Sequence, residues 1–182
     1  MTKTLSIAVA ILLFLTLTPN LYADDSVTLT SPNGQYNLTT PKGWGSADFK
    51  VDNVQIGASN PHRGEYAEVV ADRQEDYAGS LKEFAEAKRD TMAMSLDNPR
   101  LFPSQRLKIN KQDAYRFEIH GQLPGSNVSV AYCLTILATK THYIQIIGWT
   151  EESHFAENRP ELSSLAEDSQ KNPMPINSRC HR

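Results

Sequence analysis

Histidine and carboxylate side chains are the first residue types in this sequence that could hold a metal ion. The five histidines are scattered along the chain, at His62, His120, His142, His154 and His181. His120 and His142 could approach each other if their strands are neighbours, and Glu118 could join them as an oxygen ligand. Each of these residues falls near the end of a predicted strand, where exposed polar side chains are common. We therefore expect no metal site and no cofactor.

An acidic stretch could supply paired carboxylates for general acid–base work or for binding a cation. Its members are Glu65, Glu68, Asp72, Glu75 and Asp76. On an extended strand Glu68 and Asp72 would lie about 13 Å apart, at ~3.3 Å per residue. The paired carboxylates of glycosidases are ~5–9.5 Å apart. The spacing therefore favours the solvated edge of a sheet.

Motifs that assemble a known catalytic site are missing from the sequence. It has no GxSxG, HExxH, phosphate-binding GxxxxGK or EF-hand pattern. We therefore predict no catalytic residue and expect that the protein is not an enzyme. We keep a hydrolase with a non-standard site only as a remote alternative to the two hypotheses given below.

Two long loops carry side chains suited to contact with another protein. The loops span residues 53–64 and 96–103, and the side chains are those of His62, Arg63, Arg100 and Phe102. Functional contacts gather on loops that a rigid scaffold positions. We place the candidate docking surface there.

Aromatic residues suggest a second kind of site. Tyr115, Tyr132 and Tyr143 could line a pocket between the sheet and a helix, which supports an alternative hypothesis of a small-ligand or ion-binding module. The two tryptophans, Trp44 and Trp149, are interpreted as core residues with hydrogen-bonded indole N–H groups. Trp44 lies on a Pro-Lys-Gly turn, so it could instead anchor a partner.

The two cysteines leave two alternatives open. Cys133 lies in an apolar strand, and Cys180 lies three residues from the end of the chain. A disulfide between them would close a long loop and stabilise the fold by roughly 4 kcal/mol. Otherwise Cys133 packs as a small apolar residue and Cys180 remains in the tail.

The hydrophobic pattern predicts a strand-rich domain with two helices. Strands are predicted at residues 27–29, 36–39, 54–56, 66–73, 106–109, 114–120, 128–138 and 143–150. Ser80 and Glu83 form a capping box that begins a helix over residues 81–94. A last helix is expected to begin near Asn158, with Pro160 in its first turn.

The pattern also predicts the register of one hairpin. Pairing Ile109 with Tyr115 and Leu107 with Phe117 would place all four side chains on one face of the sheet. This pairing requires a loop with an odd number of residues.

The first residues have the order of regions of a secretory signal peptide. Lys3 gives a positive start, an apolar run extends from Ile7 to Leu17, and Ala23 is the small residue at a cleavage site. The run is short for a membrane span, so cleavage is favoured over an uncleaved anchor. We predict a signal peptide over residues 1–23, one domain over residues 24–170 and a flexible tail over residues 171–182. No stable membrane insertion is expected after cleavage.

Short motifs resemble the PsbP-like superfamily, which includes the periplasmic DcrB-type proteins. The pattern YxLxxPxGW at residues 36–44 is similar to the opening strand and turn of that superfamily, and the last strand and helix fit the same plan. The resemblance covers about residues 27–170. It implies an α+β fold, in which a twisted, mainly antiparallel sheet is flanked by helices as an α/β/α sandwich.

The resemblance also implies a role without catalysis. Members of this superfamily dock onto larger assemblies, and none is an established enzyme. It therefore implies a secreted or periplasmic envelope accessory protein that docks onto another envelope protein, and we expect a monomer. The lipidation cysteine of DcrB-type proteins has no counterpart after residue 23. The net charge of −3 and the pI near 5.9 argue against binding of nucleic acid.

Overall fold

The computed structural model describes residues 25–49 and 53–169 of the chain. The predicted signal peptide at residues 1–23 and the predicted tail at residues 171–182 lie outside the described residues. No helix within the described ranges is both long enough and apolar enough to cross a membrane.

Two runs of consecutive strands are each followed by one helix, an order typical of an α+β fold. The strands are β1 (Ser26–Thr30), β2 (Asn37–Pro41), β3 (Gly45–Ser46), β4 (Val54–Asn60), β5 (Glu65–Arg73), β6 (Asp97–Leu101), β7 (Gln105–Ile109), β8 (Gln112–Gln122), β9 (Ser129–Ala138) and β10 (His142–Glu151). The helices are α1 (Leu81–Met94) and α2 (Glu152–Ser169), and a short 3-10 turn, η1 (Gln74–Asp76), precedes α1.

One open sheet forms the body of the molecule. It has eight strands in the order β3-β4-β5-β10-β9-β8-β6, and β7 also pairs with β8. Every pairing in it is antiparallel. β1 and β2 form a separate two-stranded sheet. The predicted α+β class, with a mainly antiparallel sheet flanked by helices, is therefore confirmed.

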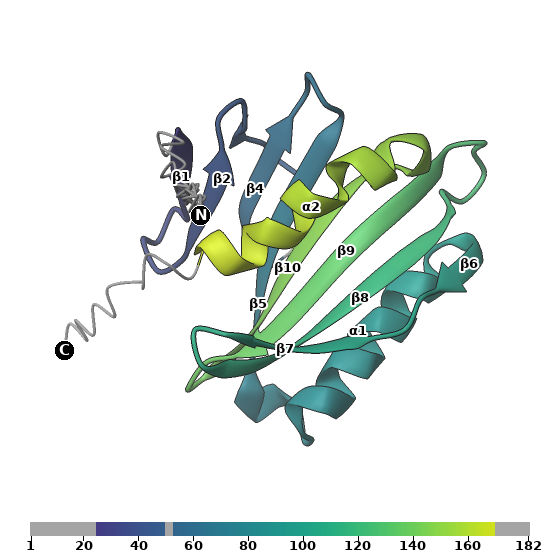
Figure 1. Ribbon diagram of the computed structural model, residues 1–182. Coiled ribbons are helices and arrows are strands. Elements are labelled where there is room, and N and C mark those ends of the chain that lie inside the picture. Colours follow the sequence, from purple (N-terminus) through teal and green to yellow (C-terminus); the bar gives the residue numbers. More distant parts are fainter. Residues whose placement is uncertain (1–24, 50–52, 170–182) are drawn as a thin grey trace, which may run out of the picture.

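The two helices lie on opposite faces of the sheet (Figure 1). α2 crosses the front face in this view and packs on β10, β9 and β2, where Leu162 and Leu165 join one apolar cluster. α1 lies behind the sheet and packs mainly on β8, with further contacts to β6 and β9, and Phe84 and Phe117 belong to a second cluster there. Because side chains alternate along a strand, each long central strand contributes to both clusters.

Helix α1 has the predicted boundaries. The Ser80 hydroxyl accepts a hydrogen bond from the Glu83 backbone N–H, and the Glu83 carboxylate accepts one from the Ser80 backbone N–H. This capping box satisfies amides that the first turn leaves unpaired.

Helix α2 begins earlier than predicted, directly after β10 at Glu152. The prediction of a start near Asn158 was wrong because Asn158 and Pro160 were interpreted as an N-terminal signal. Asn158 is in fact a buried helical residue, 3% exposed, on the face toward the sheet. Pro160 lies inside the helix on its exposed face, so water can solvate the Ala156 carbonyl that loses its N–H partner.

Two other predictions about the chain between α1 and β9 were wrong. The predicted loop at residues 96–103 contains the edge strand β6, which pairs with β8. The β7–β8 hairpin pairs Ile109 with Gln112 and Leu107 with Ala114. Its two-residue turn, Asn110 and Lys111, has φ of 46° and 69°, the backbone of a type I′ turn that matches strand twist.

Close contact between α2 and β10 depends on a glycine. A Cβ placed on Gly148 would lie 3.1 Å from Leu162 Cδ2 and 3.5 Å from Leu165 Cδ1. A larger side chain at this position would push the helix away from the central strand.

We expect Gly148→Val to lower the free energy of unfolding by about 1–3 kcal/mol, because the added methyl groups overpack the contact with α2. Gly45→Val is the matched control, since a Cβ at Gly45 meets no atom within 4 Å. Urea unfolding followed by circular dichroism measures both variants. Equal free energies of unfolding for the two would contradict this account of the α2 contact.

Candidate functional site

A groove lies beside α1 on the part of the sheet that this helix leaves open. Its volume is about 410 Å³. It is lined by Glu68 of β5, Lys88, Thr91 and Met92 of α1, Ser95, Tyr132 of β9, and Gln145, Ile147 and Trp149 of β10. We call this the aromatic groove.

A row of aromatic rings begins in the aromatic groove, which Tyr132 and Trp149 line, and continues beside it to Tyr66 and Phe49. The register aligns Tyr66, Trp149 and Tyr132 across β5, β10 and β9. Trp149 stacks on Tyr66 with ring centroids 5.5 Å apart, and its centroid is 6.0 Å from that of Tyr132. Phe49 extends the row, 5.2 Å from Trp149. All four side chains are only partly buried, or exposed in the case of Tyr66, which is 36% exposed.

The position of Phe49 depends on Gly57 in β4. A Cβ at Gly57 would lie 2.8 Å from the Phe49 ring and 2.2 Å from the Ala47 carbonyl oxygen. The Ala47 backbone N–H donates to the Gly57 carbonyl oxygen at 2.9 Å. The absence of a side chain at Gly57 therefore lets this segment fold over β4 and place Phe49 against the row.

Glu68 gives the aromatic groove a negative charge that no described residue pairs with. It forms no hydrogen bond or ion pair with any residue of the described ranges. Asp72, on the same strand and face, has two partners: Lys88 Nζ at 3.1 Å and Gln145 Nε2 at 2.6 Å. Lys88 Nζ also lies 5.1 Å from the centroid of the Phe84 ring. The cation that lines the groove is thus bound to the other carboxylate.

Burial affects the protonation of the groove residues. It raises the pKa of Glu68 above its ordinary value, and no neighbouring cation counteracts this effect. Burial, followed by the charge of Glu68, raises the pKa of Tyr132. Glu68 and Tyr132 both line the groove, so the charge of the carboxylate disfavours ionisation of the tyrosine.

A second cluster, on the α2 face, surrounds a completely buried carboxyl group. Glu65 is 0% exposed, and its Oε2 lies 3.4 Å from Arg63 Nε and 3.2 Å from Asn60 Nδ2. Its Oε1 and the Asn60 Oδ1 have no hydrogen-bond partner. Glu161 of α2 lies next to Glu65 and accepts a hydrogen bond from Trp44 Nε1 at 2.6 Å. We call these residues the Glu65 cluster.

The pKa of Glu65 is raised to about 7, chiefly by burial and then by the charge of Glu161, while Arg63 and Asn60 counteract the rise. Near neutral pH its carboxyl group therefore holds a proton in a large share of molecules. A protonated carboxyl can donate to Glu161, which removes the conflict between two adjacent negative charges.

A third cluster holds the start of α2 to the edge of the sheet. His120 Nδ1 lies 3.0 Å from Glu152 Oε1, and Nε2 lies 3.2 Å from Glu118 Oε1 without hydrogen-bond alignment. Arg100 pairs with Glu152, and Arg159 Nε lies 3.1 Å from Glu118 Oε2. The hydrogen bond from His120 and the contacts of Arg100 hold the pKa of Glu152 below its ordinary value.

A second cavity of about 420 Å³ lies beside this third cluster, between α2 and the segment after β6. Its lining includes Arg116, Glu118 and Arg159. Each of these charges is paired, since Arg116 Nη2 lies 3.2 Å from Glu167 Oε1 and Arg159 binds Glu118. This cavity therefore differs from the aromatic groove, whose carboxylate has no counter-ion in the described part of the chain.

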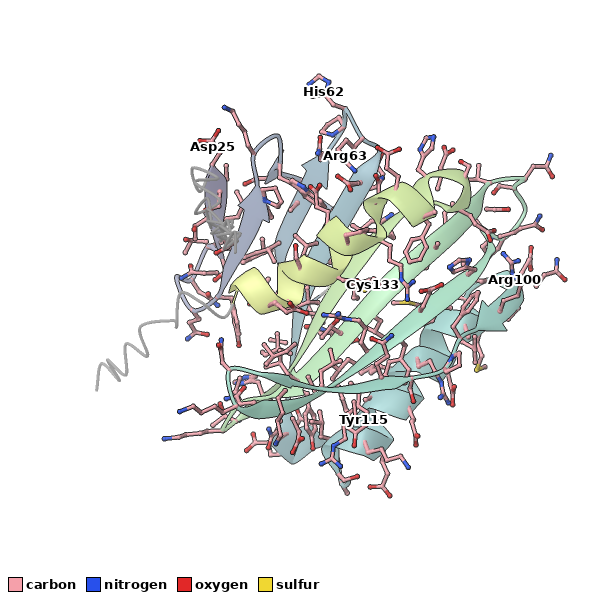
Figure 2. The ribbon with its side chains drawn as sticks, in the orientation of Figure 1. Asp25, His62, Arg63, Arg100, Tyr115 and Cys133 are labelled. Carbon is pink, nitrogen blue, oxygen red and sulfur yellow. The ribbon has the colours of Figure 1, made fainter. Side chains whose placement is uncertain are left out.

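The predicted docking residues lie in two separate groups (Figure 2). His62 and Arg63 are at the turn between β4 and β5, whereas Arg100 lies in β6 and Phe102 directly follows that strand. Arg63 donates to Asn158 Oδ1 at 2.7 Å, and Arg100 pairs with Glu152. Phe102 is 40% exposed, and the centroid of its ring lies 4.6 Å from that of the His120 ring.

The three predicted pocket tyrosines lie on the α1 face, in the same apolar cluster. Tyr132 lines the aromatic groove. Tyr143 is buried, stacks on Phe84 at 4.2 Å and donates its hydroxyl to the Gly79 carbonyl oxygen at 3.0 Å. Tyr115, which Figure 2 labels below β7, does not line the groove.

The structure separates the histidines that could have shared a metal. His120 pairs with Ala131, which pairs with Thr150, whereas His142 begins β10 at the other end of the sheet. At ~3.3 Å per residue the two positions are ~26 Å apart along the strands. Across residues 25–49 and 53–169, no group of three or more His, Cys, Asp and Glu side chains is placed to hold a metal ion.

Cys133 has a buried free thiol, 3.6 Å from the Ser163 hydroxyl (Figure 2). Burial is the main reason that its pKa is raised. Cys180, the other member of the predicted pair, lies outside the described residues.

Of the residues that line the aromatic groove, the sequence pattern predicted only Tyr132 as a pocket residue. Glu68 was interpreted as part of a solvated edge, and Phe49 and Trp149 were not linked to a site. The alternation of Tyr66 and Glu68 was a usable signal, because it places an aromatic ring and a carboxylate on one face of a strand. Their approach to Tyr132 depends on strand order, which the local pattern does not contain.

Solved structures with the same arrangement of elements identify the fold. Cyanobacterial PsbP (CyanoP) from Synechocystis sp. PCC 6803 aligns with a TM-score of 0.61 at 16% identity, over 85% of this chain and 96% of that one. The fold is PsbP-like. LpqN, which is involved in cell envelope biogenesis of Mycobacterium tuberculosis, aligns with a TM-score of 0.55 at 7% identity, over 79% of this chain and 87% of that one.

A third PsbP-like neighbour is PA94 from Pseudomonas aeruginosa, a protein of unknown function, with a TM-score of 0.50 at 13% identity over 82% of this chain and 98% of that one. The sequence matches no protein-family model and no curated protein. At these identities the PsbP-like resemblance extends to the fold and not to the site residues.

The raised pKa of Glu65 predicts that stability falls as the pH rises. The folded state keeps the proton up to about pH 7, whereas the unfolded chain loses it near its ordinary pKa of 4.5. The contribution present below pH 4.5 is therefore lost progressively up to about pH 7, and amounts to about 3 kcal/mol. Glu65→Gln stays neutral and should be more stable than the wild type at pH 8.

Thermal and urea unfolding between pH 4 and pH 8 measure this difference, with Glu75→Gln as the control because its carboxylate is exposed. The stability profiles of the wild type and Glu65→Gln should diverge over this range, and those of the wild type and Glu75→Gln should stay parallel. Parallel profiles for all three proteins would rule out a buried protonated Glu65.

Proposed function

We propose that the protein is a non-catalytic accessory protein of the cell envelope, which works outside the cytoplasm by docking onto another protein. The PsbP-like fold supports the class, since the similar LpqN is involved in cell envelope biogenesis. The signal-peptide pattern of the first residues supports the compartment. A fold alone does not transfer a function, so the proposal depends on a site in this chain.

The aromatic groove is the observation that carries the proposal. Aromatic side chains are enriched in protein interfaces, and those that anchor a partner lie in desolvated pockets. Here Phe49, Tyr66 and Trp149 contact one another, yet each keeps part of its surface open to solvent. Their scaffold is rigid, because Tyr66 and Trp149 lie opposite each other on paired strands.

The geometry around His120 supports the non-catalytic part of the proposal. A histidine that activates a nucleophile places one ring nitrogen within hydrogen-bond reach of a hydroxyl or thiol. Both ring nitrogens of His120 face carboxylates instead, those of Glu118 and Glu152. Its role in the described structure is to join β8 to the start of α2.

A second candidate is a small-ligand module of the same compartment. The volume of the aromatic groove, about 410 Å³, falls within the ~300–1,000 Å³ of small-molecule pockets. A thermal-shift screen of the purified protein tests it, because a ligand that binds only the folded state raises the melting temperature.

Photo-crosslinking from Tyr66, which stacks on Trp149 beside the groove, tests the docking function. We expect p-benzoylphenylalanine in place of Tyr66, expressed in the source organism, to form an adduct with one protein. The same group in place of Val128, an exposed residue between β8 and β9, is the control and should form no such adduct.

Competition makes the crosslink specific to the groove. An excess of unlabelled wild-type protein should remove the adduct, whereas the same excess of Phe49→Ala should not, because losing an interface aromatic weakens binding by about tenfold or more. An equal adduct from both positions, or equal competition by both proteins, would contradict docking through the groove.

A further inference from the structure

The aromatic groove contains one charge that the described structure does not neutralise. A partly buried carboxylate without a partner is costly, because burial removes part of its hydration. Among the described residues Glu68 is in this situation, whereas Asp72, four residues further along β5, has both a lysine and an amide as partners. The groove thus offers a binding position for a positive group.

Lys88, the one cation among the described residues that line the groove, does not occupy that position. Its Nζ lies 3.1 Å from Asp72 Oδ1 and 5.1 Å from the Phe84 ring centroid. Moving Lys88 to Glu68 would leave Asp72 without its ion pair. Among the described lining residues only Glu68 and Lys88 are charged, and the charge of Lys88 is already paired with Asp72, which lies outside the lining.

The walls around Glu68 are suited to an organic cation. Register places Glu68 beside Ile147, and Ile147 precedes Trp149 on the same face of β10. Trp149 and Tyr132 therefore border the carboxylate, and the faces of aromatic rings attract cations within about 6 Å of their centroids. Met92 and Ile147 supply an apolar surface for an alkyl chain.

We propose that the aromatic groove binds a lysine or arginine side chain of the docking partner, with its charge on Glu68 and its stem against the aromatic wall. This inference rests on the proposed docking function and assigns the chemistry of the partner. Charge complementarity is its basis, since a basic side chain would neutralise Glu68 and cover the exposed rings in one contact. An acidic or purely apolar partner segment would leave Glu68 buried and unpaired.

Nuclear magnetic resonance provides a direct test, because the chain has only two tryptophans. Trp149 lines the groove, whereas Trp44 is buried in the Glu65 cluster with its indole N–H bonded to Glu161. The full chain is titrated with N-acetyl-lysine methylamide and with N-acetyl-arginine methylamide. N-acetyl-norleucine methylamide is the uncharged control.

The Trp149 indole resonance should shift along a saturable curve with a dissociation constant on the order of millimolar for one side chain. The Trp44 resonance should stay in place, and norleucine should bind at least about tenfold more weakly. Glu68→Gln should weaken binding of the basic probes by about tenfold, since a hydrogen bond to a charged group is lost. Glu75→Gln, the same change at an exposed site outside the groove, should bind as the wild type does.

Three outcomes would overturn the inference. They are no shift with either basic probe, equal binding of norleucine, and equal binding by Glu68→Gln. Choline is a further arm, and a choline affinity more than about tenfold above that of lysine would assign the groove to a free quaternary ammonium ligand instead. A negative titration together with a groove-dependent crosslink at position 66 would reject the basic side chain and leave docking intact.

Discussion

Two helices cannot cover both faces of a sheet that is seven strands across, and this mismatch determines where the molecule is open. Adjacent strands lie ~4.8 Å apart, so the sheet is about 29 Å wide, whereas a helix with its side chains is only ~10–12 Å wide. Helix α2 covers the centre of one face and α1 covers the β8 side of the other. The open surface left beside α1 is the aromatic groove.

The two faces manage polar groups in different ways. On the α2 face, carboxylates lie beside arginine, histidine or a second carboxyl, and the Glu65 cluster combines burial with a proton held near neutral pH. On the α1 face, Glu68 has aromatic and aliphatic neighbours and no counter-ion within the described residues. The paired carboxylates of the α2 face hold α2 in place. On the α1 face, Glu68 is left available to pair with a positive group from outside the described residues.

The fold was predictable from the sequence, and the site was largely not. Local signals were sufficient to predict α1, because its capping box marks the residue at which the helix begins. They were insufficient for α2, because Asn158 and Pro160 are common at helix starts and tertiary contacts override that preference here. The predicted hairpin register was wrong because alternation aligned Leu107 and Ile109 with the larger apolar residues of β8. The two-residue turn instead places Leu107 and Ile109 on the α2 face with Ala114, opposite to the face of Phe117. The groove requires the neighbour relation of β5, β10 and β9, which are distant in sequence.

The outer side of β8 is shared by two short strands rather than one long one. β7 pairs with its first half and β6 with its second half, and Pro103 lies between them. β6 also contains Pro99, which has no N–H to offer, and β7 carries the cations Arg106 and Lys108. Short, charged and proline-interrupted strands make poor templates for a foreign strand. The molecule is thereby protected at this border against aggregation with other copies of itself, even at the high concentrations of a crowded compartment.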